Sequence, residues 1–116
     1  MDTVYETRNV RSARNLGEAL KYIRENYNRN LTLENVAQQI YISPYYLSHM
    51  SREELGITFV EYLTMVRMEE AKKLLMDPSL SVVAVASQVG YEDASYFSKV
   101  FKKYVGVSPN RYRRNI

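Results

Sequence analysis

The chain has 116 residues, of which 46% are hydrophobic, and it contains no cysteine and one histidine. This length suits one compact domain or two very small ones, and the missing cysteines exclude disulfides and cysteine-ligated zinc. No apolar run approaches the roughly 20 residues of a membrane-spanning helix, and the N-terminal segment lacks the apolar core of a secretion signal. We therefore expect a cytoplasmic protein without a membrane segment.

The net charge of +3 is unevenly distributed. Residues 94–116 contain six Lys or Arg and no acid, so this segment carries +6 and the remainder −3. Because Phe97, Phe101 and Tyr112 interrupt these charges and resemble core residues, the segment is predicted to fold rather than to form a basic tail. A folded basic face is a candidate surface for binding anions.

Apolar residues recur at helical spacing throughout the chain, and no stretch alternates convincingly like a strand. The sequence therefore predicts an all-α fold with about seven helices. Residues 1–14 are polar and are interpreted as a tail or the remnant of a linker, with the first amphipathic helix starting near Asn15. A short helix follows Thr32, whose hydroxyl can cap it, and another begins at Ser43-Pro44 and ends at Gly56.

The longest helix is predicted over residues 58–76. It begins at a capping box formed by Thr58 and Glu61 and ends before Asp77-Pro78. Nineteen residues correspond to about 28 Å of helix. Its expected buried face comprises Val60, Leu63, Val66, Ala71, Leu74 and Leu75.

The remaining signals repeat those of the first half. Ser81 caps a short helix that ends at Gly90, and Asp93 caps a longer one that ends at Gly106. A last short helix is predicted to begin at Ser108-Pro109.

The two halves form an internal repeat. Four positions are identical at a separation of 49 residues: Leu31 and Leu80, Val36 and Val85, Ala37 and Ala86, Gln39 and Gln88. Three more agree at a separation of 50: Tyr46 and Tyr96, Ser48 and Ser98, Gly56 and Gly106. Each repeat, residues 31–57 and 80–106, has the outline of a helix-turn-helix. The pattern alone leaves open a helical hairpin that merely packs, as in a protein-protein interaction module.

The outward positions of the second repeat favour DNA. They are predicted to be Ser95, Ser98, Lys99, Lys102 and Lys103, facing away from Phe97, Val100, Phe101 and Tyr104. Hydroxyl and ammonium groups without a carboxylate suit phosphates and base edges. In the first repeat, Tyr46 is expected to face inward like Tyr96, and Tyr45 outward. No catalytic constellation or phosphate-binding loop is present, so we expect neither an enzyme nor a cofactor.

Over about residues 15–114 the chain resembles the DNA-binding domain of AraC/XylS-type transcriptional regulators. The resemblance is carried by LTLENVAQQIYISPYYLSHM, EYLTMVRMEEAKKLL and SVVAVASQVGYEDASYFSKVFKKYVGVSPNRYRR, of which the last is the most specific. It implies a domain over 15–116 in which the linker helix 58–76 joins two helix-turn-helix units. It also implies sequence-specific binding of double-stranded DNA, with two recognition helices in successive major grooves about 34 Å apart.

The resemblance assigns roles to individual side chains. The base-facing positions are Tyr45, Ser48, His49, Ala94, Ser95, Ser98 and Lys99. The phosphate-facing positions are Ser43, Arg52, Lys102 and Lys103. Asp93 is interpreted only as a helix cap, because its carboxylate would repel a phosphate.

The resemblance also bears on partners. We expect the C-terminal piece of a longer regulator, an activator, whose sensor or receiver domain is missing here; a complete, sensor-free regulator is the alternative. The isolated domain is expected to be a monomer. The charged face of Glu69, Glu70, Lys72 and Lys73 is interpreted as solvated, although in the family such a surface can contact RNA polymerase.

Three residues depart from the family pattern. His49 stands where arginine is common, which removes a bidentate contact to guanine. Ser51 lies opposite Phe101 and predicts a less well packed first unit. Tyr41 occupies the turn position of Gly90, which predicts strain if that turn requires a positive φ.

Overall fold

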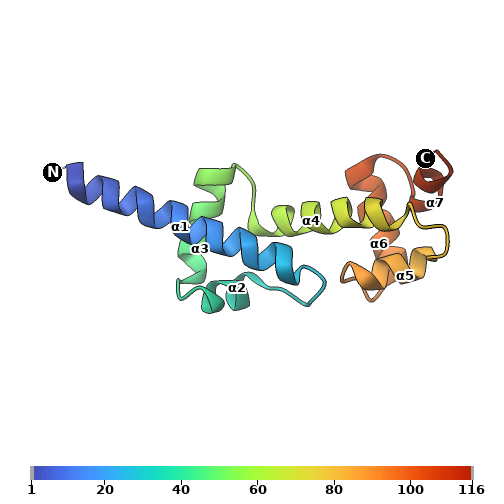
Figure 1. Ribbon diagram of the computed structural model, residues 1–116, viewed down its shortest axis with the longest axis horizontal. Helices are drawn as coiled ribbons and strands as arrows, with labels where there is room; N and C mark the ends of the chain where they lie inside the picture. Colours follow the sequence, from blue (N-terminus) through green and yellow to red (C-terminus); the bar gives the residue numbers. More distant parts are fainter. Residues whose placement is uncertain (1, 116) are drawn as a thin grey trace. The chain divides into compact units, whose positions relative to one another are not determined.

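A computed structural model describes residues 2–115 and shows seven α-helices and no strand in that range. The predicted all-α fold is confirmed. None of the helices in these residues is long and apolar enough to cross a membrane. The helices are α1 (Asp2–Asn26), α2 (Leu33–Gln39), α3 (Pro44–Met50), α4 (Phe59–Leu74), α5 (Val82–Gln88), α6 (Ala94–Val105) and α7 (Pro109–Arg114) (Figure 1).

The chain divides into two compact units. Unit 1 comprises Met1–Asn26 and Leu31–Tyr62, and unit 2 comprises Tyr27–Asn30 and Leu63–Ile116. The helix pair α2 and α3 lies in unit 1, and the pair α5 and α6 lies in unit 2. The internal repeat of the sequence therefore corresponds to one helix pair in each unit.

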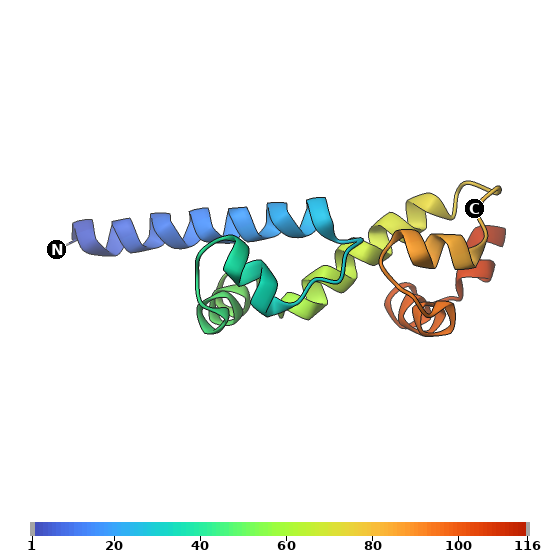
Figure 2. The same ribbon diagram turned by 90° about the horizontal axis from the view of Figure 1, so that it is seen from below.

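In unit 1, α1 packs against both α2 and α3 (Figure 2). Its core contains Ala19, Ile23, Val36, Ala37, Leu47 and Met50. Helix α1 begins at Asp2, so the prediction that it starts near Asn15 after a polar tail was wrong. Residues 2–14 contain no proline or glycine to break the helix, and the Ser12 hydroxyl lies 2.9 Å from the Tyr46 hydroxyl of α3. Because this contact is polar, the spacing of apolar residues could not predict it.

Side-chain caps open the helices at the predicted residues. Each cap accepts a hydrogen bond from a backbone N–H in the first turn of its helix. The caps are the hydroxyls of Thr32 for α2, Ser43 for α3, Ser81 for α5 and Ser108 for α7, and the carboxylate of Asp93 for α6. The Thr58 N–H donates to Glu61 Oε1 at 2.9 Å, and the Glu61 N–H donates to Thr58 Oγ1 at 3.1 Å. The bond from the Thr58 N–H to the carboxylate, together with the Thr58 side chain, holds the pKa of Glu61 below its usual value. Each cap stabilises its helix by about 1 kcal/mol.

Helix α4 contributes residues to the cores of both units, and of its predicted buried residues Leu63, Ala71 and Leu75 are buried. Phe59 is buried in the part that belongs to unit 1, whereas Met68, Ala71 and Leu75 lie in the core of unit 2. Met68 follows Phe59 by nine residues, which is about two and a half turns, so the two lie on different sides of the helix. Val60 lies on neither the Phe59 side nor the Met68 side of the helix. It is 65% exposed, so the prediction that it is buried was wrong.

The core of unit 2 is aromatic, and the equivalent core position of unit 1 is not. Phe101 is fully buried, with its ring centroid 5.8 Å from that of Phe97 and 5.6 Å from that of Tyr112. Ser51 occupies the equivalent position in unit 1, where it is 3% exposed and donates a 2.8 Å hydrogen bond to the Leu47 carbonyl. A π-helical turn, η1 (Ser51–Leu55), begins there instead of a continuation of α3.

The turn between the two helices of each pair requires a left-handed residue. Gly90 has φ 102°, and Tyr41 at the equivalent position has φ 62°, so the condition under which strain was predicted at Tyr41 is met. A side chain in this region costs about 1–2 kcal/mol. Tyr41 is 94% exposed and gains little packing in return. Space also favours glycine at position 90, because a Cβ atom there would crowd the Tyr27 carbonyl oxygen at 3.0 Å.

We expect Tyr41→Gly to raise the free energy of unfolding by about 0.5–1 kcal/mol, because it relieves the left-handed strain and removes few contacts. The matched change Gly90→Ala should lower it by at least about 1–2 kcal/mol through strain and crowding. Urea unfolding followed by circular dichroism measures both. Destabilisation by Tyr41→Gly would contradict the assignment of strain to this turn.

Candidate nucleic-acid interface

Helix α6 presents a basic, hydroxyl-bearing face in unit 2. The side chains of Ser95, Lys99, Lys102 and Lys103 are exposed and that of Ser98 is half-buried, while Phe97 and Phe101 on the other side are fully buried. Ala94, the first residue of the helix, is half-buried. The helix ends at Gly106, whose φ of 100° closes the last turn. The structure therefore brings all the predicted side chains of the second repeat to one helix.

The carboxylate of Asp93 does not disturb this basic face. Its Oδ1 accepts hydrogen bonds from the N–H groups of Ser95 at 2.9 Å and of Tyr96 at 3.2 Å. These bonds place it at the N-terminus of α6, where a negative charge is favourable. The interpretation of Asp93 as a cap is confirmed.

Two tyrosines of α6 are more exposed than was predicted. Tyr96 is 58% exposed although it was expected to face inward, and Tyr104, assigned to the apolar side, is 43% exposed. Tyr96 precedes the fully buried Phe97 by one residue and so points about 100° away from it. In the first repeat, Tyr46 is half-buried and Tyr45 is 81% exposed, so the tyrosine assignments made for that repeat are confirmed.

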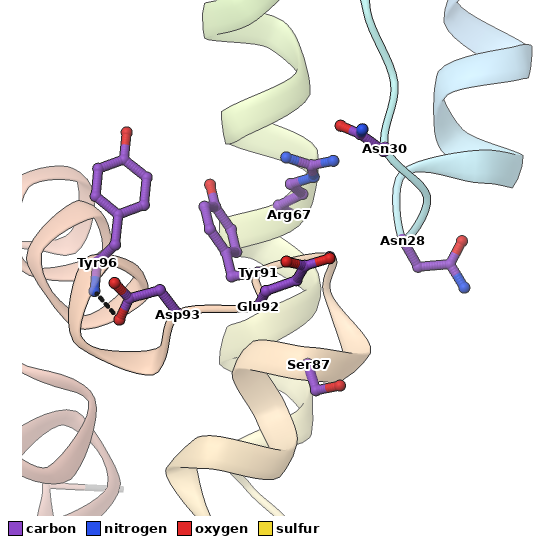
Figure 3. A pocket seen from close by; sticks show the side chains of 9 residues that line it. Asn28, Asn30, Arg67, Ser87, Tyr91, Glu92, Asp93 and Tyr96 are labelled. Atoms are coloured by element: carbon purple, nitrogen blue, oxygen red, sulfur yellow. Dashed lines mark hydrogen bonds between the residues drawn. The ribbon is translucent and has the colours of Figure 1, made fainter.

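Two hollows adjoin the start of α6. The larger, about 500 Å³, is lined by Asn28, Asn30, Arg67, Ser87, Gly90, Tyr91, Glu92, Asp93 and Tyr96 (Figure 3). The smaller, about 350 Å³, is lined by Thr64, Tyr91, Tyr96, Lys99, Val100 and Lys103. Tyr91 and Tyr96 line both hollows, and their ring centroids are 6.0 Å apart. Lys99 and Lys103 therefore flank a recess rather than lie on a flat surface.

Arg67 positions the turn that leads into α6, a role that the sequence analysis missed. Its Nε and Nη2 atoms donate to the carbonyl oxygens of Tyr27 and Arg29, both at 2.8 Å, and its guanidinium carbon lies 5.3 Å from the centroid of the Tyr91 ring. The Tyr91 ring in turn contacts Phe97, with centroids 5.6 Å apart. In the sequence, Gly90 marks the end of a helix and a turn, and it does not identify Arg67 as a neighbour of that turn.

The environment of Tyr91 is consistent with this packing. Burial raises the pKa of its hydroxyl, and the neighbouring Arg67 guanidinium and the Thr64 hydroxyl partly oppose the rise. Tyr91 therefore remains a neutral phenol near pH 7, and its ring lines both hollows beside α6.

We expect Arg67→Lys to lower the free energy of unfolding by about 1–3 kcal/mol, because an ammonium group cannot satisfy both carbonyls in the geometry of a guanidinium fork. Arg29→Ala is the matched control, since it keeps the backbone carbonyl to which Arg67 donates. Urea unfolding distinguishes them. Equal stability of Arg67→Lys and the unmodified chain would rule out a positioning role.

Unit 1 carries the predicted side chains of the first repeat on α3 and η1. Ser43 caps α3, and the exposed rings of Tyr45 and His49 are nearly parallel, with centroids 6.2 Å apart and planes inclined by 8°. Ser48 is half-buried and Arg52 is exposed. Residues 31–58 contain three Glu and one Arg, so this repeat lacks the positive charge of α6.

Two short-helix pairs, each with a left-handed turn and a capped second helix, define a tandem helix-turn-helix domain. A family model described as "Helix-turn-helix domain" matches residues 36–115. The chain belongs to this family, and specifically to its AraC type.

Similar proteins agree with this assignment. The HTH-type transcriptional regulator YijO of Escherichia coli is 47% identical over 100 residues, which cover 85% of this chain and 35% of that protein. The C-terminal domain of AraT, a response regulator from Geobacillus stearothermophilus, is 46% identical with a TM-score of 0.85, covering 88% of this chain and 85% of that one. The DNA-binding domain of the global transcriptional factor AdpA, solved with a target DNA, is 25% identical with a TM-score of 0.80, covering 86% and 90%. The chain spans about a third of the length of the curated relatives it matches.

Proposed function

We propose that this chain binds double-stranded DNA sequence-specifically as the DNA-binding part of a transcription regulator, with α3 and α6 as recognition helices in successive major grooves. The observation that carries the proposal is the face of α6, where exposed lysines and serines occur without a carboxylate. A helix of this kind can contact phosphates with its ammonium groups and base edges with its first turns. The AdpA domain, solved in complex with a target DNA, supports it.

The proposed contacts follow the positions of the side chains. Bases would be read by Tyr45, Ser48 and His49 on α3 and by Ala94, Ser95, Ser98 and Lys99 on α6. Phosphates would be bound by Ser43 and Arg52 in unit 1 and by Lys102 and Lys103 in unit 2. Because the positive charge lies in unit 2, most of the salt-dependent affinity should come from α6. A second recognition helix on the same chain adds affinity through its high effective concentration.

The proposal extends to the protein of which this domain would be a part. AraT is a response regulator and its matched piece is a C-terminal domain, which supports a sensor or receiver domain N-terminal to this one. Such a regulator would act in the cytoplasm, would activate transcription and would contact RNA polymerase while bound to its operator. We assign no catalytic role to this domain.

Fluorescence anisotropy with mixed-sequence duplex DNA across a salt series tests the DNA-binding proposal. The affinity should fall steeply as salt rises, because phosphate contacts release counterions. A weak response that is independent of salt would overturn the proposal and would direct the search to a protein partner.

We expect Lys102→Ala to weaken binding to all sequences alike and to reduce the slope of log affinity against log salt by about 0.9. Lys99→Ala should in addition relax the preference at one operator position, because this lysine is placed to face a base. Selection from a random duplex pool, with both variants in parallel, measures the difference. If the two lysines gave the same sequence profile and the same slope, the assignment of Lys99 to a base would be wrong.

A further inference from the structure

We propose that α3 recognises thymine by its 5-methyl group, and that the ring pair of Tyr45 and His49 makes this contact. The inference rests on the proposed DNA-binding function and assigns a chemical target to one of the two recognition helices. Thymine is the one base that presents a methyl group in the major groove, so an apolar contact there identifies it.

The position of Tyr45 is suited to this contact. It follows Pro44, the first residue of α3, and recognition helices meet base edges with their N-terminal residues. Its side chain is 81% exposed, so the ring is available without any rearrangement of the core.

His49 extends the exposed Tyr45 ring into a larger aromatic surface. The two residues are four apart, on one side of the helix, and their ring planes are inclined by only 8° with centroids 6.2 Å apart. Offset stacking at this distance is favourable and restricts the rotation of both side chains. A preordered aromatic surface loses little conformational entropy when it contacts DNA.

The charge of unit 1 leaves little else to supply the contact. Helix α3 contains neither Lys nor Arg, and η1 carries Glu53 and Glu54 beside Arg52. At the positions equivalent to Tyr45 and His49, α6 has Ser95 and Lys99. The two recognition helices thus present different chemistry at matched positions, aromatic rings in α3 and hydroxyl and ammonium groups in α6.

The experiment begins with an operator selected from a random duplex pool, in which each thymine is then replaced in turn by deoxyuridine. This change removes only the methyl group. At one or more positions we expect the unmodified chain to lose about fourfold in affinity per methyl, the value for one buried methyl-sized group. The same loss should occur in Tyr45→Phe, which keeps the ring, and should disappear in Tyr45→Ala.

The controls separate this inference from the function on which it rests. Ser95→Ala should leave the methyl effect unchanged, and circular dichroism with urea unfolding should show that every variant is folded, as the exposure of Tyr45 predicts. Salt-insensitive, weak binding of all duplexes would overturn the proposed function itself. Three results, each with salt-dependent binding, would overturn the thymine inference alone. The methyl effect could be absent, it could persist in Tyr45→Ala, or the selected operator could contain no thymine.

Discussion

The bonds from Arg67 to the carbonyls of Tyr27 and Arg29 are the interaction on which the geometry of the second helix-turn-helix depends. Residues 27–30 are flanked in sequence by unit 1, yet they are part of unit 2, and these bonds explain why. The same guanidinium lies over Tyr91, which packs against Phe97 of α6. Gly90 leaves room for this arrangement, because a Cβ atom there would crowd Nε and Nη2 of Arg67 at 3.2 Å. One side chain thus links a loop, the linker helix and the recognition helix.

The two units share their local construction and differ in their cores and surfaces. Both have a hydroxyl cap on the first helix, a left-handed residue in the turn and a glycine after the second helix. In unit 2 the second helix is anchored by Phe97 and Phe101, whereas in unit 1 Ser51 turns its hydroxyl to the Leu47 carbonyl and the helix continues as a π-helical turn. The outer faces have diverged as well, since one is basic and the other aromatic.

Each unit therefore offers a different kind of contact on the same scaffold. Exposed ammonium groups bind phosphates strongly but respond to salt and read little sequence. Aromatic rings contribute little long-range attraction but discriminate by shape and by apolar contact. Under the proposed function, α6 would supply attraction to any duplex and α3 an additional, charge-independent preference.

The sequence by itself determined the helices, their caps, the repeat and the family, because these depend on spacing and on residues adjacent in the chain. Ser43, Ser81 and Asp93 cap helices that begin one residue later, as their types predict. Tertiary structure alone decided which residues are buried where a helix contributes to two cores: Phe59 and Met68 lie on different sides of α4, and no single periodic stripe could reveal both. Tertiary structure also decided the extent of α1, where Ser12 contacts Tyr46 of α3. It decided the role of Arg67 as well, because the partners of this side chain are backbone carbonyls about 40 residues away, which carry no signature in the sequence.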